Sequence, residues 1–322
     1  MKIEYLNKDE YEIWDDFVSK HAKGNIFHTS KWLRNQSGEF KIIVIKEDSI
    51  IVAGFAFIVT KKAWVSGIFK PPYTPYFHPL IKEISRDGNS EKEIEILTKI
   101  LKEIAKYNTS LIFDSNTKYF FPYQNHGFKI SPKVNYTVDP SLFMTSIAKR
   151  KKSSINKYIK EQNKGNLKIV EDFNINEVLS LWIEFGKSKS LNVYKDLLFE
   201  IFNSESKFTN WGCVKIFSKE EKLLAAGLYL FDDKKLYNLI PIVNYQILSN
   251  KEKNIGDYLY YKLSIIAEDK GLILDYEGSD VEGVEKMYRR LGGSLDLKHT
   301  ATKFNSIMNL IYFLNRIKNL II

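Results

Sequence analysis

A pattern that occurs twice is the strongest constraint on how this chain can fold. Four features recur in the same order in both halves: a helix with a tryptophan, a β-rich segment with Ala-Gly, an apolar strand and Tyr-x-x-x-Gly. They lie at 10–18, 50–59, 111–116 and 123–127, and again at 177–185, 223–241, 272–277 and 288–292. Short strands can look alike, but a shared order of this kind is typical of a duplicated fold. We therefore predict that each half contains two helices, antiparallel strands, a further helix and a final strand.

Local patterns define individual elements. Gly54 interrupts the first β-rich segment and is expected to break it into a pair of strands. Ser90 and Glu93 form a capping box for a helix over 90–107, whose apolar residues fall on one face. The counterpart in the second half is a helix over 254–270.

These elements predict an α/β fold of the α+β type with two tandem domains, residues 1–140 and 141–322, each a mixed and mostly antiparallel sheet flanked by helices. The second domain should begin with a basic helix over 141–166, ended by Gly165. Residues 305–322 should form an amphipathic helix, which could pack back on the first domain.

Composition narrows the class of protein. With 44% hydrophobic residues the chain can bury sizeable cores, and its longest apolar runs are too short to span a bilayer. Residues 1–20 are too acidic for a signal peptide. The single cysteine, Cys213, excludes an intramolecular disulfide and a cysteine zinc site, and the five histidines lack the spacing of metal ligands. We therefore expect a soluble cytoplasmic protein without a structural metal.

The positive charge is concentrated in one segment. The whole chain has a net charge of +9, and Lys149–Lys168 alone carries eight basic residues against Glu161, a net charge of +7. Such a segment favours an anionic partner such as RNA or membrane headgroups. The alternative is a helix whose solvated face is rich in lysine.

The stretch 272–294 contains an apolar strand that turns into a helix. Ser279 and Glu282 form a capping box at the helix start, a position where backbone N–H groups often bind phosphate. Asp280 and Glu282 already occupy that positive end, and Asp275 and Glu277 lie nearby. Each carboxylate would repel a phosphate by about 1 kcal/mol at 4 Å in water. The stretch is therefore not a phosphate loop.

The two acids at the end of this strand suit a different ligand. Strand alternation would place Asp275 and Glu277 on the same side, next to the helix start. A carboxylate there could hold an ammonium group and take its proton as the amine attacks an acyl group. The alternative is a solvated strand end and a helix cap.

With these residues in view, the chain resembles the FemABX-like branch of the GNAT acyltransferases, over nearly its whole length. The resemblance is carried by NIFHTSKWL (25–33), KPPYTPYFHPL (70–80), KKSSINKYIKEQNKGNLKI (151–169), AAGLYLF (225–231) and, most specifically, DYEGSDVEGVEKMYRRLGG (275–293). It implies two tandem GNAT-like domains. It also implies transfer of an acyl or aminoacyl group to an amine of a sugar- or peptide-containing acceptor.

The resemblance implies acyl-CoA or aminoacyl-tRNA as donor, with no tightly bound cofactor. Two departures bear on the donor. The family's phenylalanine-lysine pair is replaced by Met287 and Tyr288, and a neutral tyrosine cannot supply a fixed cation, although Arg289 or Arg290 could. The GNAT pyrophosphate loop is reduced to KEKNIGDYL (251–259), in which only Gly256 remains as a cofactor-binding candidate.

The second domain provides the first group of candidate site residues. GNAT chemistry polarises the acyl carbonyl at a splayed strand, which should be 236–244, where Pro241 interrupts the ladder. Tyr237 and Asn238 of that strand are candidate substrate-binding residues. Both could equally be ordinary strand residues.

Four further candidates come from the resemblance and from the charge pattern. Trp32 matches a position that lines the acceptor pocket, and Tyr73 and Tyr76 flank prolines in a loop expected to face the cleft between the domains. Lys152 stands where the family usually has arginine and could bind acceptor pyrophosphate or tRNA. The alternatives are a core tryptophan, loop packing and a solvated lysine.

The prediction is an N-acyltransferase of the FemABX-like class, acting in cell-envelope or polysaccharide synthesis, with Asp275, Glu277 and Tyr288 as its catalytic residues. Its partners would be a small-molecule or nucleotide-linked acceptor, and tRNA for an aminoacyl donor. The alternative is a non-catalytic binder of anionic partners through Lys149–Lys168. Membrane attachment through residues 305–322 is a third hypothesis.

Overall fold

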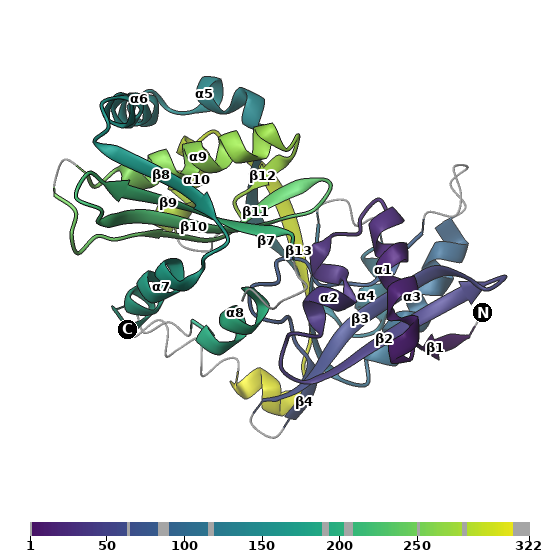
Figure 1. The fold of residues 1–322 in the computed structure, drawn as a ribbon. Coiled ribbons are helices and arrows are strands. Elements are labelled where there is room, and N and C mark those ends of the chain that lie inside the picture. Colours follow the sequence, from purple (N-terminus) through teal and green to yellow (C-terminus); the bar gives the residue numbers. More distant parts are fainter. Residues whose placement is uncertain are drawn as a thin grey trace. The chain divides into compact units, whose positions relative to one another are not determined.

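The two Ala-Gly segments each form one strand of a mixed sheet in the computed structural model, which describes residues 2–62, 65–82, 90–114, 119–188, 193–202, 209–249, 252–278 and 282–311 (Figure 1). They are β3 (Ile50–Lys62) and β10 (Leu223–Phe231). The expected break at Gly54 is wrong, because β3 runs straight through it. Glycine is needed there for packing, since a Cβ would lie 2.6 Å from the ring of Trp14.

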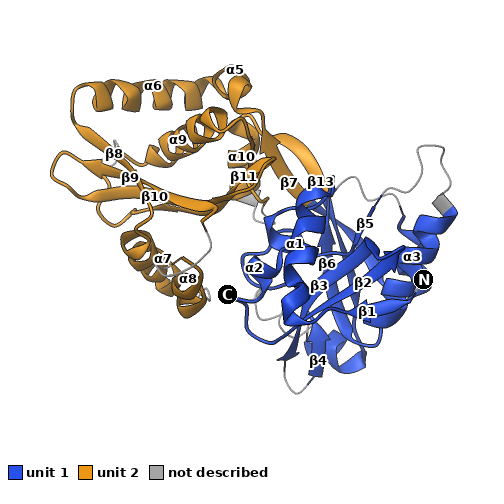
Figure 2. Ribbon diagram, turned by 45° about the vertical axis from the view of Figure 1, so that its right-hand side comes forward, with its two compact units in different colours: residues 1–133, 298–322 blue, residues 134–297 orange. Residues whose placement is uncertain are grey.

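The chain divides into two compact units (Figure 2). Unit 1 comprises residues 1–133 and 298–322. Its elements are β1 (Ile3–Tyr5), α1 (Tyr11–Lys20), α2 (Ser30–Leu33), β2 (Glu39–Glu47), β3, β4 (Val65–Ile68), β5 (Leu80–Ile81), α3 (Ser90–Ile104), β6 (Asn108–Phe113), α4 (Phe121–Asn125) and the second half of β13 (Ser294–Lys303). Short 3-10 helices cover Lys8–Glu10 and Ile26–His28.

Unit 2 comprises residues 134–297. Its elements are the second half of β7 (Lys129–Val138), a 3-10 helix (Pro140–Leu142), α5 (Phe143–Ser146), α6 (Lys149–Asn163), β8 (Leu167–Asp172), α7 (Asn176–Ser188), α8 (Lys195–Phe202), β9 (Trp211–Ser218), β10, β11 (Lys235–Val243), α9 (Ile255–Asp269), β12 (Ile273–Asp275) and α10 (Glu282–Arg290).

Both units have the same strand order and the same strand directions. In unit 1 the order is β1-β2-β3-β4-β6-β13, and in unit 2 it is β8-β9-β10-β11-β12-β7. In each unit one neighbouring pair is parallel, β4 with β6 and β11 with β12, and the pairs on either side are antiparallel. The predicted mixed, mostly antiparallel sheets flanked by helices are therefore confirmed.

Each sheet is completed by a strand from the other half of the sequence. β7 follows the first repeat along the chain but pairs with β12, and β13 follows the second repeat but pairs with β6. The units consequently divide at 133/134 and again at 297/298, whereas the sequence predicted one boundary at 140/141. Local patterns do not reveal such an exchange, because the alternation within a strand sets which face is buried but does not specify which sheet the strand joins.

The predicted helices mostly form where their apolar periodicity lies. In α9 the four residues expected to face inward are all buried: Ile255, Leu259, Leu263 and Ile266. The single basic helix predicted over 141–166 is wrong, because Ile147 is extended (ψ 149°) and separates α5 from α6. The side chain of Ser90, residues 279–281 and residues 312–322 lie outside the described residues.

Helices cover both faces of the unit 2 sheet (Figure 2). α9 packs on β10, β11 and β12, while α7 covers the other face. α6 lies across α9, and its Ile155 and Tyr158 are buried in the same core as the inward side chains of α9. Among the described helices, none is both long enough and apolar enough to cross a bilayer.

Candidate active site

The candidate site in unit 2 lies where two parallel strands separate. β11 and β12 are paired only from Lys235 to Tyr237, opposite Ile273 to Asp275. β11 continues to Val243, and within the described residues this further part pairs only with β10, across a bulge at Leu239. The predicted splayed strand thus exists and carries Tyr237 and Asn238.

Unit 1 closes the equivalent edge with its proline-rich loop. Phe77 exchanges two backbone hydrogen bonds with Ile112 of β6, at 2.8 and 3.0 Å, and β5 then pairs with β3. Among the described residues, the edge of β11 beyond Tyr237 has no such backbone partner on the β12 side.

The carboxylate of Asp275 is completely buried and holds two partners. The ammonium of Lys235 lies 3.3 Å away, and the backbone N–H of Glu277 donates to Asp275 at 2.8 Å. Lys235 also lies 3.6 Å from Asp296. Asp275 was expected to bind an ammonium group. The ammonium group that it binds is that of Lys235, a residue of the same chain.

The expected alternation of Asp275 and Glu277 is wrong. β12 ends at Asp275, and Glu277 has a left-handed backbone (φ 65°), as does Gly278. A Cβ at Gly278 would lie 2.2 Å from the backbone oxygen of Val134, so this tight turn requires glycine. The turn, rather than strand alternation, places the half-buried carboxylate of Glu277.

Tyr288 belongs to a cluster of buried tyrosines. Its ring lies 5.0 Å from that of Tyr276 and 5.9 Å from that of Tyr260, between ring centroids. The hydroxyl of Tyr276 donates to the backbone oxygen of Leu291 at 3.0 Å. Burial raises the pKa of Tyr288 to about 12; a hydrogen bond from Tyr260 opposes this rise, and the charges of Glu277 and Asp275 add to it. Tyr288 is thus a neutral hydrogen-bond donor at ordinary pH.

Asn238 is a buried amide on the part of β11 that β12 does not pair. It is 2% exposed, and no described residue hydrogen-bonds to either amide atom within normal geometry, but its side chain lies near enough to donate toward Tyr260, whose pKa it lowers. Buried amides are nearly always paired, so Asn238 is a candidate polar contact for a ligand or a water molecule.

Tyr237 and Asn238 point to opposite faces of the sheet because they are adjacent in one strand. The Tyr237 hydroxyl donates to Asp232 at 2.9 Å, and burial raises its pKa, reinforced by the charges of Asp232 and Asp275. Asp275, the register partner of Tyr237, lies on that same face. We define the splayed-strand site as Tyr237, Asn238, Asp275, Glu277 and Tyr288.

Sequence reasoning missed two contributors to this site. Tyr260 bonds to Tyr288, and Lys235 pairs with Asp275. The Tyr-Leu-Tyr-Tyr run of α9 was a weak signal for Tyr260. No local signal identifies Lys235, because its partner is 40 residues away.

Three other predicted residues of unit 2 lie on exposed surface. Arg289 is 3.4 Å from Glu285, and Arg290 bonds through its backbone oxygen to the N–H of Ala148 at 2.9 Å. Lys152 is exposed on α6. They are not among the residues gathered around Tyr288.

The candidates in unit 1 surround a buried aromatic group. Trp32 is fully buried, and its indole N–H donates to Thr74 at 3.0 Å. Tyr76 is also buried, with the Lys298 ammonium 4.0 Å from its ring centroid. Tyr73 is half-buried with a left-handed backbone (φ 53°), in the turn that follows two prolines.

Gly256 lies in the first turn of α9. A Cβ there would lie 3.2 Å from Val243, so the glycine allows α9 to approach β11. Asp257, one residue further, is buried and paired with Lys151 at 2.5 Å, and Glu252 accepts a hydrogen bond from the N–H of Ser249 at 3.0 Å. Two carboxylates at this helix start do not fit the pyrophosphate of coenzyme A.

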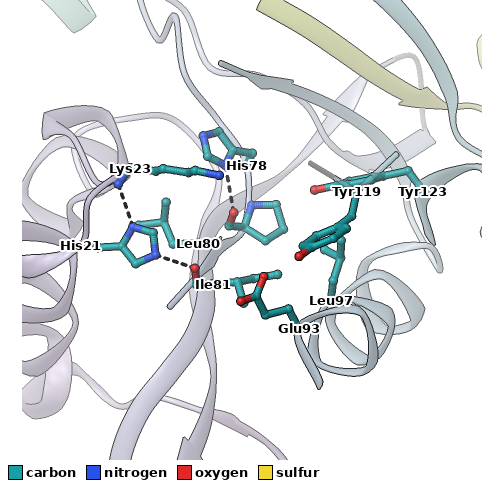
Figure 3. Close-up of a pocket in the computed structure, with 10 residues that line it drawn as sticks. His21, Lys23, His78, Leu80, Ile81, Glu93, Leu97, Tyr119 and Tyr123 are labelled. Atoms are coloured by element: carbon teal, nitrogen blue, oxygen red, sulfur yellow. Dashed lines mark hydrogen bonds between the residues drawn. The ribbon is translucent and has the colours of Figure 1, made fainter. Parts of the chain in front are cut away.

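Unit 1 also contains a small cavity that sequence reasoning missed (Figure 3). Its volume is about 50 Å³, and its lining includes His21, His78, Glu93 and Tyr123. His21 bonds to the oxygen of Ile81 at 2.8 Å, and burial lowers the pKa of His78. The described residues contain no group of three or more His, Cys, Asp or Glu side chains able to hold a metal ion.

The buried tyrosines make stability depend on alkaline pH. Burial raises the pKa values of Tyr237, Tyr260, Tyr276 and Tyr288 above the value of about 10 for an unfolded chain. Their contribution to stability is therefore complete below about pH 10 and is lost as pH rises toward 12 and beyond. We expect tyrosinate absorbance to appear together with loss of near-ultraviolet circular dichroism. Titration of all tyrosines near pH 10 in a folded protein would contradict this.

The described residues form two units with the same strand order and strand directions. No protein-family model matches the sequence, and no curated protein matches it. Similar solved structures include FemX, at 12% identity over 97% of this chain and 99% of FemX with a TM-score of 0.68. L-PGS from Bacillus licheniformis is 13% identical over 96% of each chain, with a TM-score of 0.59.

A third similar structure is a tandem GNAT protein from the clavulanic acid biosynthesis pathway, solved without acetyl-CoA. It is 10% identical over 95% of this chain and 100% of its own, with a TM-score of 0.53. At these identities the likeness establishes a shared fold alone.

Proposed function

We propose that the chain is an N-acyltransferase of the FemABX-like class. It would transfer an acyl or aminoacyl group to an amine of a sugar- or peptide-containing acceptor, in cell-envelope or polysaccharide synthesis. The observation that carries this proposal is the buried amide of Asn238 on the part of β11 that β12 does not pair, next to Tyr260, which bonds to Tyr288. A ligand carbonyl at this position would accept a hydrogen bond from the amide, which has no partner of normal geometry among the described residues.

In the proposed reaction, each residue of the splayed-strand site named below has one role. The acceptor nitrogen attacks the acyl carbon; a C–N bond forms, and the bond from that carbon to the donor breaks. Glu277 takes the amine proton, and the amide N–H of Asn238 donates to the acyl oxygen, both in the bound donor and as that oxygen becomes the oxyanion. Tyr288 gives a proton to the leaving group. Asp275 acts as a positioning residue, because it binds Lys235 and the backbone N–H of Glu277.

Two features favour an oxygen ester such as aminoacyl-tRNA over acyl-CoA as donor. The start of α9 presents Asp257 and Glu252 where a GNAT protein binds pyrophosphate. The raised pKa of Tyr288, about 12, also suits a strongly basic alkoxide leaving group. A thiolate, with a pKa of about 8.5, needs no such proton donor.

The remaining candidates are proposed as acceptor contacts. Tyr73 retains exposed surface and could stack on a sugar or peptide, while Trp32 and Tyr76 support it from the core of unit 1. Lys152 and the arginine pair Arg289 and Arg290 would bind anionic groups of the acceptor or the donor.

Asn238→Leu tests the site because stability and binding should move in opposite directions. Removing an unpaired buried amide should leave the melting temperature equal or higher, whereas donor binding should weaken about 10- to 100-fold. The probes are acetyl-CoA, aminoacyl-tRNA and amino-sugar nucleotides, measured by isothermal titration. Asn163→Leu, on the exposed end of α6, is the matched control. Absence of binding of every probe to the folded wild-type protein would overturn the proposal.

A further inference from the structure

The outer face of α6 carries a continuous row of lysines. Lys149, Lys152 and Lys160, with Lys164 just after the helix, recur at helical spacing, and all are exposed. The opposite face is occupied by Ile155 and Tyr158, which are 0% and 3% exposed. We call this row the α6 lysine stripe. The helix of 15 residues would extend it over about 22 Å.

Little negative charge offsets this stripe. Glu161 is the one acid within α6; it lies 3.1 Å from Lys164 and also accepts from Asn166. Of the other acids near α6, Asp257 is buried and already pairs with Lys151, whereas Glu220 and Glu252 line the same hollow as Lys157 and Glu161. The stripe therefore presents cations on a surface that the core of unit 2 does not use.

We propose that the α6 lysine stripe docks the protein on an anionic bilayer surface, such as one containing phosphatidylglycerol. A straight row of lysines can approach a plane of anionic headgroups along its whole length without a fixed spacing of phosphates. The binding is peripheral, because Ile155 and Tyr158 of α6 are buried and Ile159 is partly buried against the same core. This inference does not depend on the proposed acyl transfer.

Nucleic acid is the poorer match for the same surface. Arginine is the residue suited to bidentate phosphate contacts, and α6 has one arginine, Arg150, outside the stripe. Single strands also need aromatic side chains on which bases stack, and the aromatic residue of α6, Tyr158, is buried. RNA is therefore tested as the competing outcome.

The test compares sedimentation of the full chain with phosphatidylglycerol–phosphatidylcholine vesicles and with phosphatidylcholine vesicles alone. We expect binding to the anionic vesicles only, lost as salt rises from about 0.1 to about 1 M. The triple variant K149Q/K160Q/K164Q should weaken it about 100-fold, since each lysine contributes about fivefold. Lys152 is left intact because it belongs to the proposed substrate contacts.

A second triple variant, K102Q/K129Q/K187Q, removes the same charge from exposed positions elsewhere and should bind vesicles within about threefold of wild type. Equal losses in both variants would show a net-charge effect and overturn the proposal. Binding that survives high salt would overturn it as well, because it requires insertion. So would absence of vesicle binding, and tighter salt-dependent binding of labelled RNA would then identify the stripe as an RNA surface.

Discussion

Replacing Tyr288 with phenylalanine is expected to lower kcat by about 10²- to 10³-fold, with KM changed little. The variant keeps the ring that stacks on Tyr276 but loses the hydroxyl that receives the hydrogen bond from Tyr260. Loss of a donor that acts on developing charge costs this much in other enzymes. The measurement is steady-state kinetics with whichever donor and acceptor bind.

Two tyrosines on one helix provide the comparison. Tyr258→Phe removes a buried hydroxyl bonded to Gln162, away from the site, and should leave kcat within about threefold. Tyr260→Phe removes the bond that lowers the pKa of Tyr288, so any alkaline limb of the kcat profile should move to higher pH. A Tyr288→Phe enzyme as active as Tyr258→Phe would remove Tyr288 from the mechanism.

Asp275→Asn is expected to have the largest effect on stability, lowering the free energy of unfolding by about 2–3 kcal/mol. The carboxylate is fully buried, and its loss leaves the Lys235 ammonium without its buried counter-ion. Breaking a fully buried pair costs about 3–5 kcal/mol. The smaller value is expected because the Lys235 side chain is 25% exposed and keeps Asp296 at 3.6 Å. Urea unfolding measures the change.

The double variant Asp275→Asn with Lys235→Met should recover part of the loss, because no unpaired charge is left buried. Asp16→Asn breaks the exposed pair with Lys20 and should cost less than about 1 kcal/mol. If Asp275→Asn costs no more than Asp16→Asn, the carboxylate is not the positioning group that we propose.

The parts of the fold that could be predicted are those that depend on sequence patterns of a few residues. Apolar periodicity located α9 and its buried face, and the repeated Ala-Gly and Tyr-x-x-x-Gly patterns indicated two equivalent units. The prediction of one long basic helix was wrong at Ile147 and Ala148, two extended residues that separate α5 from α6. Such a break depends on how the flanking turns pack, which no period in the sequence records.

Some members of the candidate site were proposed from the sequence, but their geometry was not. Asp275, Glu277 and Tyr288 lie in one short stretch, so their motif could be recognised. The backbone turn at Glu277, the Lys235 partner of Asp275 and the bond from Tyr260 to Tyr288 depend on contacts with β11 and α9. Trp32 was equally consistent with a pocket or a core position until its full burial was seen.

Sequence by itself determined that this chain contains one architecture twice, because strand alternation, helical periodicity and turn residues act over a few positions. Only the tertiary structure decided that β7 completes the sheet of unit 2 and β13 the sheet of unit 1. It also decided that β11 is unpaired with β12 beyond Tyr237 in the described part of unit 2, while Phe77 pairs with Ile112 in unit 1. Those outcomes depend on which of several compatible segments pack together in the folded chain. Contacts between residues that are far apart in the sequence decide this.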